Sequence, residues 1–126
     1  MSDDRWPIDP ADLDFFSEQN VRRFWKSVVK HGHHVGVRSL EIKLGCADET
    51  TAALVAAHFQ ANDHRDVRVR EVTDSREPTP EWEVIGSTPP RVIDEEYFVE
   101  VHEWMASTIQ RFGCHFRALS NSGRAA

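Results

Sequence analysis

The chain has 126 residues, of which 40% are hydrophobic and 29% charged, which is the size and composition of one domain with a modest core. Its formal charge of −6 lowers the expectation of a nucleic-acid-binding protein, because phosphate contacts require a local basic patch. The sequence has no apolar run near the roughly 18 residues of a membrane span, and its first residues are acidic, unlike a signal peptide. We therefore expect a cytoplasmic protein that contacts neither a membrane nor, directly, nucleic acid.

The N-terminal part predicts an acidic leader followed by a helix. Residues 1–16 are rich in Asp but carry apolar side chains, part of which should pack on the domain. Ser17 can cap a helix over residues 17–31, in which apolar residues recur at helical spacing until Gly32. This helix would precede the main body of the domain.

The next segment predicts a strand, a helix and a second strand. Residues 37–44 alternate between apolar and polar side chains, which is typical of a half-buried strand. Asp48 can cap a helix that extends to Asn62, and the alternation returns at residues 67–70. Apolar residues therefore recur every second residue in the first strand, every three or four residues in the helix, and every second residue again in the second strand.

A third strand and a long helix follow. Turn-forming residues predict a loop over residues 74–80, and alternation predicts a strand over residues 81–84. Asp94 can cap a helix that extends to Phe112, and Gly113 would end it.

The order of these elements predicts the fold. Residues 114–119 alternate as a fourth strand, and the small, polar tail of residues 120–126 should fray. After the first helix the order is β-α-β-β-α-β, which is the ferredoxin-like split βαβ motif. We predict an α+β, ferredoxin-like domain with an antiparallel sheet in the order 4-1-3-2, both helices on one face, and an extra N-terminal helix. Residues 17–119 would form this single domain.

The predicted topology places Cys46 beside Cys114, because the first strand ends where the fourth begins. The same register pairs Leu44 with Phe116 and Ile42 with Ala118, with these side chains facing the helices. A redox pair is one interpretation, and a Cys/Cys/His metal site that includes His115 is another. We favour two small buried thiols, since a free Cys packs as a small hydrophobic residue and a zinc site needs four ligands.

The opposite face of the predicted sheet is charged. Acidic residues on the inner strands lie between basic residues on the outer strands, which favours cross-strand ion pairs. Inner strands of this kind are unlike the aromatic platforms on which single-stranded RNA stacks. The residues of this face are Glu41, Lys43, Arg68, Arg70, Glu81, Glu83 and Arg117.

The histidines fall into two groups, which we interpret separately. His31, His33 and His34 form a cluster that could bind a divalent metal, but without neighbouring acidic or Cys ligands we favour a solvated turn. His58 and His102 lie on apolar helical faces, where we expect them at the edge of the core with one hydrogen bond each.

The sequence contains no recognisable catalytic motif, so we expect no catalytic residues, no metal site and no cofactor. A binding surface on the last helix is the better hypothesis, because Trp and Arg are common in interface hot spots. Another interpretation is that the leader or the first helix covers the aromatic rings. The predicted partner-binding residues are Tyr97, Trp104, Arg111, Glu95 and Glu96.

Several segments within residues 37–119 resemble the family of the regulator of ribonuclease activity B, the protein inhibitors of ribonuclease E. The resemblance rests on the first strand leading into the Ala-rich helix of residues 51–61, on the strand Glu-Trp-Glu-Val at 81–84, and on the long helix that runs into residues 112–116. Family members carry an aromatic residue followed by Asp-Gly-Trp in the last strand, whereas Arg-Ala-Leu follows Phe116 here.

The resemblance implies a small acidic bacterial regulator that inhibits an endoribonuclease through protein–protein contact, without catalysis, as a monomer or homodimer. Two other classes stay open from the residues. One is a small-ligand or metal-binding sensory domain that uses the His33 and His34 turn or the Cys46 and Cys114 edge. The other is an immunity-type inhibitor of another basic toxin.

Overall fold

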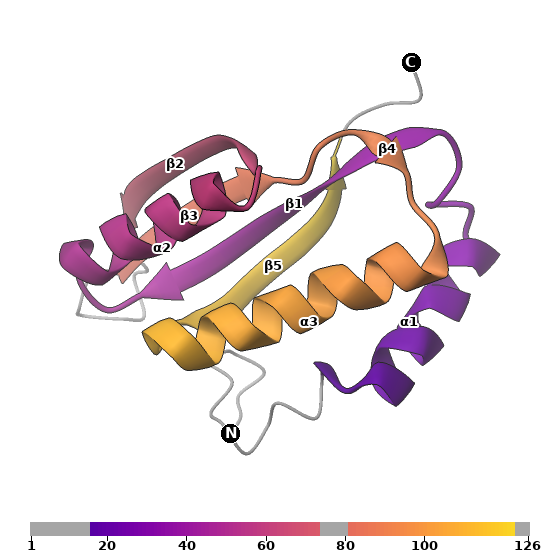
Figure 1. Cartoon of the computed structure of the whole chain (residues 1–126), viewed down its shortest axis with the longest axis horizontal. Coiled ribbons are helices and arrows are strands. Elements are labelled where there is room, and N and C mark those ends of the chain that lie inside the picture. The colour runs from indigo at the N-terminus through magenta and orange to yellow at the C-terminus, as the bar shows by residue number, and fades with distance from the viewer. Residues whose placement is uncertain (1–15, 74–80, 123–126) are drawn as a thin grey trace.

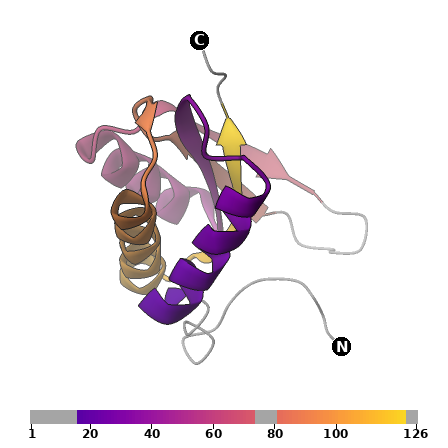
Figure 2. The same ribbon diagram turned by 90° about the vertical axis from the view of Figure 1, so that its right-hand side faces the viewer.

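The protein folds into a sheet with helices on one side. The structure, a computed structural model, describes residues 16–73 and 81–122. Helices α2 and α3 cover one face of a five-stranded antiparallel sheet, and α1 packs beside α3 (Figures 1 and 2). The predicted loop at 74–80 and the predicted leader, except Phe16, lie outside the described residues.

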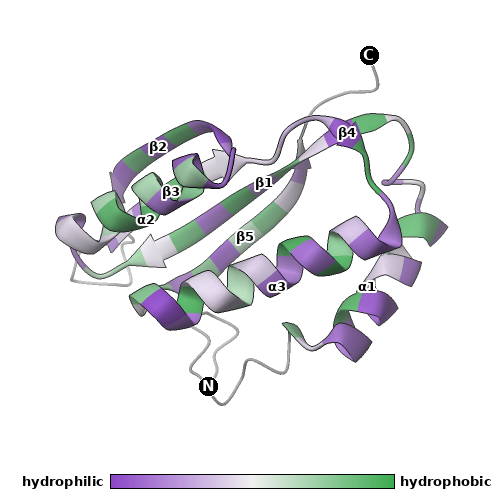
Figure 3. Cartoon of the chain, in the orientation of Figure 1, coloured by the Kyte–Doolittle hydropathy of each residue, from purple (hydrophilic) through white to green (hydrophobic). Residues whose placement is uncertain are grey.

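The strand order confirms the predicted ferredoxin-like topology. The central strand, β1 (Val37–Cys46), pairs with β3 (Glu81–Ser87) on one side and β5 (His115–Ser122) on the other. β2 (Arg65–Val72) pairs with the outer edge of β3. In the numbering of the four predicted strands this order is 4-1-3-2. Hydrophobic and hydrophilic residues alternate along β1, as expected for a strand with one buried face (Figure 3).

A short fifth strand, β4 (Arg91–Val92), was not predicted. It pairs with Val37 and Arg38, at the beginning of β1. Thr88 continues the ladder between β3 and β4, because its backbone N–H donates to the Leu40 carbonyl at 2.9 Å. Two prolines follow Thr88 and supply no N–H group, so the pairing is interrupted there.

The three helices of the described residues begin at the predicted caps. The side-chain oxygens of Ser17, Asp48 and Asp94 each accept a hydrogen bond from the backbone N–H three residues later, at 3.3, 2.7 and 2.8 Å. Gly113 ends the last helix in the left-handed conformation, with φ of +70°. The helices are α1 (Glu18–Lys30), α2 (Glu49–Ala61) and α3 (Glu95–Phe112).

A bulge at Arg117 changes the register between β1 and β5. Leu44 lies opposite Phe116, as predicted, whereas Lys43 lies opposite Ala118. Arg117 is therefore the extra residue on β5.

The bulge makes the predicted pairing of Ile42 with Ala118 wrong. Ile42 lies opposite Leu119, and Ala118 shares the other face of the sheet with Lys43. β5 also extends to Ser122. The prediction that the tail frays from residue 120 is therefore wrong for residues 120–122. Residues 123–126 lie outside the described residues.

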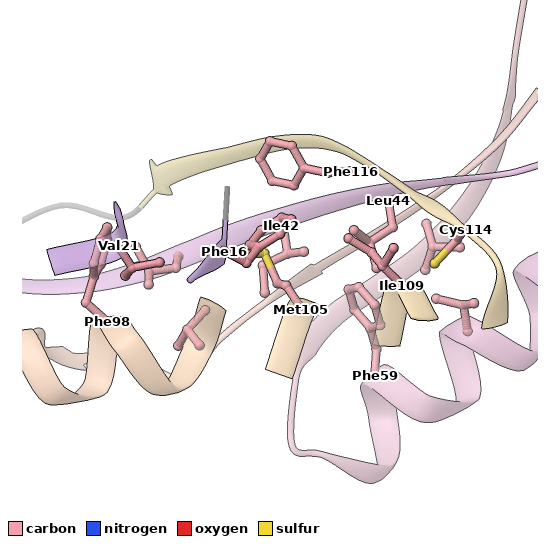
Figure 4. Close-up of a cluster of buried hydrophobic side chains, with 14 of the residues drawn as sticks. Phe16, Val21, Ile42, Leu44, Phe59, Phe98, Met105, Ile109, Cys114 and Phe116 are labelled. Atoms are coloured by element: carbon pink, nitrogen blue, oxygen red, sulfur yellow. The ribbon is translucent and has the colours of Figure 1, made fainter. Parts of the chain in front are cut away.

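The core lies between the sheet and the helices (Figure 4). Ile42 and Leu44 of β1 meet Phe59 of α2 and Met105 of α3, and all four are fully buried. Phe16, the first described residue, is also buried, as expected for part of the leader. This core fixes α3 over the sheet and so positions the residues predicted to bind a partner.

Candidate partner-binding site on helix α3

Two of the predicted partner-binding residues, Tyr97 and Trp104, line the same pocket. Its volume is about 240 Å³, and it lies between α3, the residues after α2 and the connection from β3 to β4. The other lining residues are Asn62, His64, Thr88, Pro89, Glu100 and Val101. The pocket therefore combines three segments that are far apart in the sequence.

Aromatic rings hold Trp104 in place. The imidazoles of His64 and His58 stack on the indole, with centroids at 4.5 and 5.3 Å, and Phe59 meets it edge-on at 5.1 Å. The buried indole N–H of Trp104 has no hydrogen-bond acceptor among the described residues. A buried donor without an acceptor is uncommon in a folded protein.

The stacked histidines are held as neutral rings. Burial lowers the pKa of His64 and of His58, and the positive charge of Arg111 lowers the pKa of His58 further. Protonation of either ring would place a charge against the indole in a partly dry site. The wall of the pocket around Trp104 is therefore apolar in character at neutral pH.

Tyr97 forms the other aromatic wall. The guanidinium carbon of Arg91, in β4, lies 4.0 Å from the centroid of the Tyr97 ring in a cation–π contact. Glu100 lines the pocket one helical turn after Tyr97 and is exposed. Glu100 has no ion-pair partner within residues 16–73 and 81–122.

The structure does not bring Glu95, Glu96 and Arg111 into the pocket. Arg22 of α1 binds Glu95 at 2.7 Å and Glu96 at 2.9 Å, so these two acids connect α1 to α3. The hydrogen bonds from Arg22 lower the pKa of Glu96. Arg111 lies over the ring of Phe112, at 5.0 Å, at the far end of α3.

Helix α1 does not cover the pocket. Its Phe24 and Trp25 pack against Phe98 of α3, with ring centroids at 5.4 and 5.1 Å. No residue of α1 lines the pocket. Among the described residues, the interpretation that the first helix covers Tyr97 and Trp104 is therefore wrong.

Two of the three histidines of the predicted turn face solvent. The rings of His31 and His33 stack at 6.0 Å, and both residues are exposed, while His34 meets Trp25 edge-on at 5.9 Å. Within residues 16–73 and 81–122, no group of three His, Cys, Asp or Glu side chains is placed to hold a metal ion. Of the predicted core-edge histidines, His102 is buried and bonded through Nδ1 to the Phe98 carbonyl at 2.8 Å.

The charged face of the sheet carries the predicted cross-strand ion pairs. Glu83 is buried and accepts hydrogen bonds from Arg70 and Arg117 at 2.8 Å each. Glu81 binds His115 at 3.0 Å and also contacts Arg117. These side chains neutralise one another across the sheet.

Sequence patterns found one wall of the pocket and missed the rest. Tyr97 and Trp104 could be selected because they follow the core stripe of a helix. Asn62, His64 and Thr88 lie in or next to connections, and only the folded sheet brings them beside α3. A His shortly after a predicted helix end carries no signal of its own.

Comparisons with known proteins found neither a family model nor a curated relative that matches this chain. No helix in the described part of the chain is long and apolar enough to cross a membrane.

Proposed function

We propose that this protein is a regulatory protein-binding domain that captures its partner through the pocket between Tyr97 and Trp104. One observation carries the proposal: two aromatic side chains of α3 line a small pocket together with residues that follow α2 and β3. Tyr and Trp are enriched in the hot spots of protein interfaces, where one side chain commonly fills a pocket of the partner. The predicted interface residues Glu95, Glu96 and Arg111 also belong to α3 but lie outside the pocket.

The size of the pocket favours a protein partner over a small ligand. Its volume of about 240 Å³ lies below the roughly 300–1,000 Å³ of typical small-molecule sites. It suits a single side chain better than a whole metabolite. The sensory-domain alternative therefore has less support than the protein-binding one.

The partner we propose is an endoribonuclease of the ribonuclease E type, inhibited by contact and without catalysis. The support is the resemblance in residues 37–119, together with the net charge of −6. Glu100 and Glu103 are exposed on α3 and carry no ion pair to any described residue. Acidic groups of this kind increase the rate of association with a basic surface and orient the pocket toward that surface.

The test is a binding titration of the purified protein against ribonuclease E, combined with cleavage of a standard RNA. We expect saturable binding and slower cleavage. Glu100→Lys should weaken binding about tenfold or more, because it reverses a charge at the pocket rim without touching the core. Glu71→Lys is the matched control, since Glu71 is also exposed but lies on β2, away from the pocket.

The outcomes separate the two parts of the proposal. An equal loss with both variants would show that net charge alone drives binding and that the pocket is not the site. Absence of binding at micromolar protein would remove the ribonuclease as the partner. Trp104→Ala adds a further check, provided that its melting temperature shows that the variant still folds.

A further inference from the structure

We infer that Cys46 and Cys114 form a modification site: a hydroperoxide oxidises them to a disulfide that joins the end of β1 to the start of β5. Both thiols are free and buried in the structure. The inference does not depend on the proposed partner.

The register of the sheet places the two cysteines opposite each other. Gly45 lies opposite His115. Cys46 follows Gly45 and Cys114 precedes His115, so in this antiparallel pair the two cysteines are the next residues to lie opposite each other. Directly opposed residues of antiparallel strands have Cα atoms about 4.5–5.5 Å apart. A disulfide requires about 4.4–6.8 Å, so the backbone already has the spacing.

Both side chains point to the same side of the sheet. Leu44 and Phe116 face the core, and side chains two residues apart on a strand share a face. Cys46 and Cys114 accordingly belong to the hydrophobic cluster, with exposed fractions of 1% and 6%. Figure 4 shows Cys114 in this layer, near Ile109 of α3.

The Cys114 thiol donates a hydrogen bond to the Thr108 carbonyl at 3.8 Å. The interaction between the two neighbouring thiols lowers the pKa of Cys114 and raises the pKa of Cys46. Cys114 is therefore the thiol that ionises first, and a thiolate is the form that attacks an oxidant.

A small oxidant can reach this pair although both sulfurs are buried. Cys46 is the last residue of β1, and Cys114 immediately precedes β5, so each lies at the end of an element. The adjacent residues Ala47 and Gly113 are exposed. Opening of an element end requires far less free energy than global unfolding, and hydrogen peroxide is small enough to use such an opening.

The chemistry balances with one peroxide molecule. The Cys114 thiolate attacks one peroxide oxygen, the O–O bond breaks, and a sulfenic acid and hydroxide form. The sulfur of Cys46, after losing its proton, attacks the sulfenic sulfur, the S–S bond forms and the S–O bond breaks. The two thiol protons convert the two hydroxides to water, so two thiols are oxidised and one peroxide is reduced to two waters.

The test is intact-mass spectrometry of the whole protein before and after hydrogen peroxide, followed by a non-reducing peptide map. We expect the loss of two hydrogens and a peptide pair that joins residue 46 to residue 114. Addition of dithiothreitol should reverse both changes. Gain of oxygen atoms without a cross-link, or a disulfide only between two protein molecules, would overturn the inference.

Two further measurements keep the result specific. Cys46→Ala should stop the reaction at a sulfenic acid on Cys114, which dimedone traps, and an untrapped variant would contradict the assigned order of attack. The oxidised wild-type protein should melt about 10 °C higher than the reduced protein, because the bond closes a long loop of the unfolded chain. An unchanged or lower melting temperature would show that the native register does not accommodate the bond.

Discussion

Glu83 is a carboxylate with a side chain only 3% exposed, on the face of the sheet that the described helices leave open. Burial of a charge is unfavourable unless the charge is paired and hydrogen-bonded. Both carboxylate oxygens of Glu83 meet this requirement: one accepts a hydrogen bond from Arg70 and the other accepts one from Arg117. The bulge in β5 matters here, because Arg117 is the extra residue that reaches back to β3.

Replacement of Glu83 with Ala should lower the free energy of unfolding by about 1–3 kcal/mol, since two charge-assisted hydrogen bonds are lost. The loss stays below that of a fully buried pair because the side chains of Arg70 and Arg117 are 60% and 34% exposed and can turn to water. Urea denaturation measures the change. Glu71→Ala, at an exposed position of β2, is the control. Equal free energies of unfolding for the two variants would show that the hydrogen bonds from the arginines to Glu83 do not stabilise the fold.

At the scale of the elements, a close approach between Gly86 and Phe59 determines how near α2 lies to the sheet. Gly86 of β3 lies against the ring of Phe59, and a Cβ atom at position 86 would overlap that ring. Phe59 is fully buried and contributes to the core, so it has little room to move. The absence of a side chain at one strand position therefore sets the distance between a helix and a strand.

We expect Gly86→Ala to destabilise the protein by about 1–3 kcal/mol through this overlap. The same substitution should be less harmful in a Phe59→Leu background, because the smaller side chain makes room for the methyl group. A double-mutant cycle with urea denaturation measures the coupling. Additive effects of the two substitutions would place the cause of the destabilisation somewhere other than this contact.

The sequence predicted the elements well where a local pattern determines them. Alternation in residues 37–44 and the caps Ser17, Asp48 and Asp94 depend on neighbouring residues, and all appear in the structure. β4 escaped prediction because it has two residues and follows two prolines. The bulge at Arg117 left a weak trace, since Phe116 and Leu119 both lie opposite core residues yet are three positions apart rather than two.

At the scale of the whole molecule, the candidate site is only partly encoded in any local pattern. Tyr97 and Trp104 stand out on one helix, but the opposite wall depends on how the chain returns from α2 and β3. The predicted acids Glu95 and Glu96 illustrate the converse. Their place at a helix N-terminus is visible in the sequence, whereas their pairing with Arg22 requires α1 to dock beside α3.

The packing of the histidines makes the stability of the whole fold depend on pH. Burial lowers the pKa of His58, His64 and His102 below the value of about 6.5 that His has in an unfolded chain. Above that pH both states hold these rings neutral, and the full stability is present. As the pH falls below about 6.5, the unfolded chain binds protons that the folded chain does not, so the free energy of unfolding decreases toward the lower folded pKa values.

We therefore expect a lower melting temperature at about pH 5.5 than at about pH 7.5, a window that lies above the titration of most carboxylates. His102→Asn should reduce this pH dependence, because it removes one of the buried rings while the amide nitrogen at the Nδ1 position can still donate to the Phe98 carbonyl. His33→Asn, at an exposed position, should leave the dependence unchanged. Thermal melts of the three proteins at both pH values decide the matter. A wild-type melting temperature that is constant or higher at the acidic value would contradict the assignment of buried, neutral histidines.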